Sequence, residues 1–109
     1  MENTDIFINW EKQGRHIEDS QYYIEGRSIL TADAEMLIRF YTGKGKKQID
    51  DKGNFKGKET FVHVDEIGIW KDKQGNYYKT NRGTIHYSNT GAHIVPSMPI
   101  NLFLEEGSL

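Results

Sequence analysis

Short alternating segments separated by turn signals fill the second half of this chain, and they limit its fold more than any other feature. Each segment alternates apolar and polar residues with a period of two, as a strand with one buried face does. The segments are residues 60–64, 67–71, 77–80, 84–88 and 92–95. Glycine-containing turn signals separate the later ones, with DKQGN at 72–76, NRG at 81–83 and NTG at 89–91. Strands so close in sequence predict an antiparallel meander.

A helical pattern precedes these strands. Thr31 is the N-cap candidate, Asp33 and Glu35 follow in the first turn, and Gly43 ends the pattern. The apolar residues of one face are Ala34, Leu37, Ile38 and Tyr41. A shorter helical turn is expected around residues 20–25. The sequence therefore predicts an α+β fold, with an N-terminal helix or helices packed on a four- to five-stranded antiparallel sheet.

The remaining segments complete a single-domain interpretation of residues 1–109. Residues 1–14 alternate weakly and fit either an added edge strand or a loosely attached arm. Residues 44–59 carry many lysines and glycines and few large apolar side chains, which is typical of a solvated loop. We place the core of the domain at residues 12–96 and a C-terminal tail at 97–109.

Composition narrows the possible functions. Fourteen Lys and Arg against sixteen Asp and Glu give a net charge of -2, so a nucleic-acid site would have to be a local basic patch. The absence of cysteine excludes disulfides and thiolate metal ligands. There is no apolar run long enough to span a membrane and no secretion signal at the N-terminus, which predicts residence in a cytosol and no membrane partner.

The run KTNRGTIHYSNTGAHIVP at residues 79–96 concentrates the chemistry. It contains Lys79, His86 and His93, and imidazole is the side chain that exchanges protons most readily near neutral pH. Strand alternation places His86 and Ser88 on one face. Whether His93 joins them depends on the turn, because only an even-length loop or a bulge brings the two histidines to the same face.

These groups suit attack of a ribose 2′-hydroxyl on the adjacent phosphate. The reaction needs a base, an acid and donors or cations on the charged phosphorane, and Lys79 and Arg82 are candidate cations. The carboxylate cluster of a magnesium nuclease is missing from this run, so neither a metal nor another cofactor is expected. Each residue also has an ordinary structural interpretation: Ser88, Thr80 and Asn81 are common turn residues, and most strand histidines have no catalytic role.

Several motifs resemble one known family. They are GRHI at 14–17, GRSIL at 26–30, YTGKG at 41–45, TNRGTIHYS at 80–88 and GAHIVP at 91–96. In this order they resemble the phage-associated nuclease family of the barnase-EndoU-colicin E5/D-RelE class, the polymorphic toxin type 50 domain. The resemblance implies N-terminal helices followed by a twisted antiparallel sheet, and a metal-independent RNase activity that leaves a 2′,3′-cyclic phosphate.

The resulting hypothesis is a small endoribonuclease. Its predicted catalytic residues are His16, Lys79, His86 and His93, and its predicted phosphate- or substrate-binding residues are Arg15, Thr80, Arg82 and Ser88. His16 and His86 would share the base and acid roles. RNA is the expected substrate, an immunity or antitoxin protein is an expected partner, and the expected setting is a bacterial cytosol, with a phage or prophage origin. The competing hypotheses are a non-catalytic binding module and a head-associated structural protein with the same fold.

Overall fold

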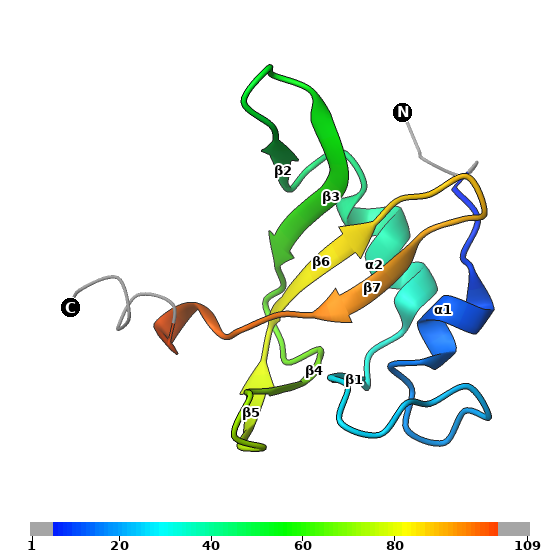
Figure 1. Ribbon diagram of the computed structural model, residues 1–109, viewed down its shortest axis with the longest axis vertical. Coiled ribbons are helices and arrows are strands. Elements are labelled where there is room, and N and C mark those ends of the chain that lie inside the picture. Colours follow the sequence, from blue (N-terminus) through cyan, green and yellow to red (C-terminus); the bar gives the residue numbers. More distant parts are fainter. Residues whose placement is uncertain (1–5, 103–109) are drawn as a thin grey trace.

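The computed structural model describes residues 6–102 and shows an α+β fold (Figure 1). Its elements are α1 Trp10–Gly14, β1 Ile29–Leu30, α2 Ala34–Tyr41, β2 Lys46–Ile49, β3 Phe55–Val62, β4 Gly68–Lys71, β5 Tyr77–Thr80, β6 Arg82–His86 and β7 His93–Pro96. The strands form two antiparallel sheets, one in the order β1-β4-β5 and one in the order β2-β3-β6-β7. The α+β class is confirmed, but the expected meander is divided between the two sheets.

Helix α2 is the helix expected from the sequence, with a different N-cap. The Asp33 carboxylate accepts hydrogen bonds from the backbone N–H groups of Glu35 and Met36, at 2.9 and 3.2 Å. The predicted N-cap, Thr31, instead donates its hydroxyl to the Ile67 carbonyl oxygen. The prediction of Thr31 was wrong because Asp33 is an equally good cap, and the backbone of Thr31 is already bonded to the loop before β4.

The described part of residues 1–14 is neither an edge strand nor a loose arm. Asn9 caps α1 by accepting from the backbone N–H of Lys12, and Ile8 forms an isolated parallel bridge with Ala92. The first five residues of that segment lie outside the described residues. Around residues 20–25 the chain forms hydrogen-bonded turns, not the expected helical turn.

The lysine-rich segment 44–59 is a hairpin, and the prediction of a loop was wrong. Strand β3 begins at Phe55, and β2 pairs with it in the register Lys46 to Thr60 and Lys47 to Glu59. The exposed residues of β2 gave no apolar alternation to detect. Pairing of β3 with β6 fixes this hairpin in place through partner strands that are distant in sequence.

The four-stranded sheet has one covered face and one open face. Helix α2 lies behind β6 and β7 in the view of Figure 1, and its Leu37 and Ile38 pack with Phe61, Ile85 and Ile94 in the core. Because side chains alternate along a strand, the neighbours of these core residues point to the opposite face. We call that opposite face the open face.

Candidate active site

The turn between β6 and β7 brings two of the predicted histidines together. His86 and His93 are direct partners in the register, so residues 87–92 form a loop of even length between them. Their side chains therefore share the open face, and their ring centroids lie 5.0 Å apart. The Ser88 hydroxyl stabilises the loop by donating a hydrogen bond to the Gly91 carbonyl oxygen. Gly91 has a φ of 118°, a backbone conformation that glycine adopts readily.

His16 reaches the same place from the other end of the chain. Its ring stacks on that of His93, with a centroid distance of 6.1 Å and an interplanar angle of 17°. The contact depends on Gln13, a fully buried side chain of α1. Its amide group accepts from the backbone N–H of Ile94 at 2.7 Å and donates to the Ile94 carbonyl oxygen at 3.0 Å. Gln13 thus occupies the outer edge of β7 as a neighbouring strand would, and it positions the following turn with His16.

The hydrogen bonds of His16 determine which ring nitrogen can accept a proton. Its Nδ1 lies 3.0 Å from the Ser28 carbonyl oxygen and 3.2 Å from the Ser28 hydroxyl. A carbonyl oxygen only accepts, so Nδ1 carries the hydrogen in the neutral ring and Nε2 holds the free lone pair. No group of residues 6–102 forms a hydrogen bond with Nε2. His16 is thereby oriented as a proton acceptor.

The other two rings are half-buried and lack such partners. Within residues 6–102, neither the His86 nor the His93 ring makes a hydrogen bond. Burial lowers the pKa of His86 to about 4, helped by the charges of Lys58 and His16. Burial likewise lowers the pKa of His93 to about 4, helped by His86, His16 and the cations of α1.

The pKa of His16 is also lowered, mainly by burial. The hydrogen bond to the Ser28 carbonyl oxygen opposes this shift, and the nearby charges of Arg27 and Arg15 add to it. All three rings are therefore neutral near pH 7 in the unliganded protein. Their environment disfavours a positive charge on the rings. A bound anion would raise the pKa values of the three imidazoles and so favour their protonation.

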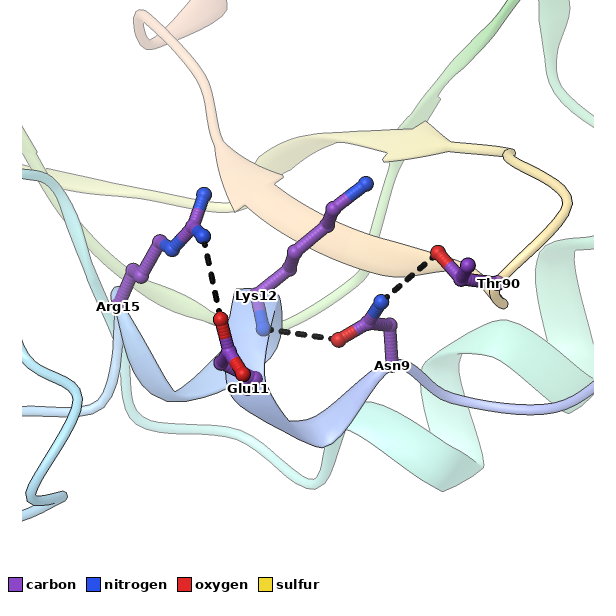
Figure 2. Close-up of polar contacts among 5 residues, drawn as sticks. All are labelled: Asn9, Glu11, Lys12, Arg15 and Thr90. Atoms are coloured by element: carbon purple, nitrogen blue, oxygen red, sulfur yellow. Dashed lines mark hydrogen bonds and ion pairs between the residues drawn. The ribbon is translucent and has the colours of Figure 1, made fainter.

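Cations surround the three rings. Lys58 on β3 is the register partner of His86, and Lys12 of α1 and Arg15, the C-cap residue of α1, act on His93. Figure 2 shows the Lys12 and Arg15 side chains extending from α1 on the side of β7, with Arg15 held by Glu11 at 3.5 Å. Asn9 also ties the start of α1 to the β6–β7 loop through a 2.9 Å hydrogen bond to Thr90. Arg15 was predicted as a binding residue, and it lies beside the cluster.

The remaining predicted site residues lie elsewhere. Lys79 is exposed on β5, in the other sheet. Thr80 is buried and donates its hydroxyl to the Ser97 carbonyl oxygen at 2.7 Å, and Arg82 donates to the Met98 carbonyl oxygen at 3.2 Å. Ser88 forms hydrogen bonds within its own turn. The roles of these four residues therefore stay predictions.

Sequence reasoning missed four contributors to the site. Lys12 and Lys58 supply charge, Gln13 holds α1 against β7, and Ser28 orients His16. Residue type could not reveal them. Two are ordinary surface lysines, Gln13 bonds to a backbone 81 residues away, and Ser28 offers its own backbone carbonyl to a ring 12 residues away. Only the register of β3 against β6 identifies Lys58.

Two further properties concern metals and membranes. Within residues 6–102, no group of three or more histidines and carboxylates has an arrangement that could hold a metal ion. The three rings of the cluster form a row of stacked and tilted planes. Across the same residues, no helix has the length and apolar character needed to cross a membrane.

The fold and the site together define a small α+β domain with a cationic, histidine-bearing sheet face. Comparison with protein families adds the identity of the class: residues 8–96 match the family described as bacterial toxin 50. The match covers most of the chain and includes all three clustered histidines, so the chain belongs to the bacterial toxin 50 family. A search of curated proteins found no match.

Proposed function

We propose that this toxin domain is an endoribonuclease that needs no metal. The ribose 2′-oxygen attacks the adjacent phosphorus, the bond from phosphorus to the 5′-oxygen breaks, and the products are a 2′,3′-cyclic phosphate and a 5′-hydroxyl. The observation that carries the proposal is the row of three imidazoles, with neighbouring centroids 5.0 and 6.1 Å apart, among cations on an open sheet face. In this row, the outer rings can contact different oxygens of one phosphate that lies against the central ring.

His16 is the proposed general base. Its Nδ1–H is committed to the Ser28 carbonyl oxygen, so Nε2 is the atom that takes the proton from the 2′-hydroxyl. His86, at the other end of the row, is the proposed general acid that protonates the leaving 5′-oxygen. His86 must first be protonated. The positive charge of Lys58 lowers the pKa of His86, and the negative charge of a bound phosphate would raise it and so favour the protonated ring.

Charge stabilisation is assigned to the centre of the row. His93 together with Lys12 and Arg15 from α1 faces the negative charge that grows on the phosphorane. Lys58 contributes from the β3 side. This set takes the role that sequence reasoning gave to Lys79, because its charges act on the central ring of His93 and on His86.

The toxin family gives this chemistry a biological setting. RNA cleavage in a bacterial cytosol would account for toxicity, and a producing cell would need an immunity protein against it. Such a partner would bind best by placing acidic side chains over the cationic open face. A phage or prophage origin remains part of the same proposal.

The test is RNA cleavage by purified protein in the presence of EDTA. His16→Ala and His86→Ala should each lower kcat by about 10²–10⁴-fold, the usual contribution of a general acid or base. His63→Asn is the matched control, because His63 bonds to the Tyr41 hydroxyl at the far end of β3 and is outside the row. Full activity of either alanine variant, or loss of wild-type activity with EDTA, would contradict the mechanism.

A further inference from the structure

We propose that the groove along β2 and β3 binds the sugar-phosphate backbone of the RNA substrate, several nucleotides from the phosphate that is cleaved. This inference rests on the proposed function, since it assigns a second contact region for the same substrate. The groove has a volume of about 880 Å³ and is formed by the loop after α2, by β2 and β3, and by the start of β6. We call it the β2–β3 groove.

The charge of the groove is entirely of one sign. Its cationic lining residues are Lys44, Lys46, Lys47, Lys56 and Arg82. No acidic side chain of the described residues lines it, although the whole chain has a net charge of -2. A concentration of five cations in a net-acidic protein creates the local basic patch that a polyanion requires.

The fold withdraws the one carboxylate that would oppose this charge. Glu59 lies in the middle of β3, yet it points to the covered face and is 1% exposed. There it accepts hydrogen bonds from the backbone N–H groups of Gly43 and Gly45 and from the Tyr87 hydroxyl. Its charge is thus satisfied on the far side of the sheet, and it also anchors the loop that carries Lys44.

The groove and the histidine row lie along the same strands. The pairs Lys58 with His86 and Val62 with Arg82 are both in the β3–β6 register, four residues apart along β3. Four residues of strand span about 13 Å. That distance corresponds to roughly four nucleotides at the ~3.4 Å rise of a stacked strand. An RNA strand bound at the histidine row can therefore continue into the groove.

Apolar surface in the groove supports a nucleic acid over inorganic anions. Ile49 and Val62 are about half exposed at its walls, at 52% and 50%. Such side chains can pack against ribose and base surfaces, while the lysines contact phosphates. A long strand gains from both features, whereas a single phosphodiester is too short to reach them.

The binding test uses a fluorescent oligonucleotide of 12 nucleotides with 2′-O-methyl riboses, which cannot be cleaved by 2′-hydroxyl attack. The variant is Lys46→Gln/Lys56→Gln, and the control is Arg39→Gln/Lys73→Gln, which removes the same charge outside the groove. Loss of two phosphate contacts should reduce the salt slope of log K by about 1.4 and the affinity about tenfold near 0.15 M salt. The control double variant should bind as the wild type does.

The cleavage test separates this inference from the proposed function. On long RNA the groove variant should show a KM raised about tenfold, and on a dinucleotide its kcat/KM should equal that of the wild type. Equal binding of the oligonucleotide by the groove variant and the control would overturn the inference while leaving the mechanism at the histidines intact. Absence of any cleavage would refute the proposed function without affecting the binding result.

Discussion

The contact between Gln13 and Ile94 makes a quantitative prediction about stability. Gln13→Met keeps a side chain of similar length but removes both hydrogen bonds to the edge of β7. Ile94 is fully buried, so its N–H and C=O groups would lose their partners in a site with little access to water. Each unsatisfied group costs about 1–3 kcal/mol, and we expect a total loss of about 4 kcal/mol. This is a large part of the ~5–15 kcal/mol that stabilises a domain of this size.

Urea unfolding at pH 7, followed by circular dichroism, measures this loss. The midpoint should fall while the m-value stays constant, as expected for a change in the native state alone. Gln74→Met is the control, since Gln74 is exposed in the turn between β4 and β5 and its replacement should change stability by less than about 0.5 kcal/mol. A loss below about 1 kcal/mol for Gln13→Met would refute the view that this amide holds α1 on β7.

Three further predictions concern stability. The free energy of unfolding should fall by about 3 kcal/mol from pH 7 to pH 4. His86 and His93 have a pKa of about 4 in the folded protein, so the unfolded chain binds more protons than the folded protein does below pH 6.5. The two side chains are partly exposed to solvent, which about halves the full effect of this proton linkage. The variant His86→Asn/His93→Asn should remove most of this pH dependence of the unfolding free energy in urea titrations. An unchanged pH dependence would contradict its assignment to these two histidines. Asp33→Ala should cost about 1 kcal/mol in the same assay through loss of the α2 cap, whereas an effect near zero would argue against that cap. Gly68→Ala should lower Tm by more than 10 °C, because its Cβ would collide with the Ile29 carbonyl oxygen in the β1–β4 pair; a wild-type Tm would show that this approach is not tight.

Local patterns in the sequence predicted the elements whose formation depends on their own residues. The apolar face of α2 with Leu37 and Ile38 was correct, and so were the approximate positions of β4 to β7. The predicted turn at residues 81–83 was wrong, because Arg82 and Gly83 already belong to β6 and the chain passes there from one sheet to the other. The β2–β3 hairpin could not be predicted in this way. Its residues are mostly exposed, and its strand pairing is decided by β6, whose partner residues are 20 or more positions away.

The candidate site, like the fold, was only partly predictable from the sequence. The parity of the β6–β7 loop was left open by the sequence, and the register of His86 with His93 resolves it. The approach of His16 was expected only from the family resemblance, since it depends on a buried glutamine that bonds to a backbone 81 residues away. Lys58 enters through strand pairing alone. Residue type and spacing in the sequence therefore could not predict the site contacts that join distant parts of the chain.

Cleavage by a ribose 2′-hydroxyl at the histidine row can be recognised from the products of a single substrate. The substrate is a DNA oligonucleotide with a single ribonucleotide, incubated with the wild-type protein in EDTA and analysed by mass spectrometry. We expect one cut, immediately after the ribonucleotide, with a 2′,3′-cyclic phosphate on one product and a 5′-hydroxyl on the other. Cleavage at deoxynucleotides, or products that carry a 5′-phosphate, would contradict it.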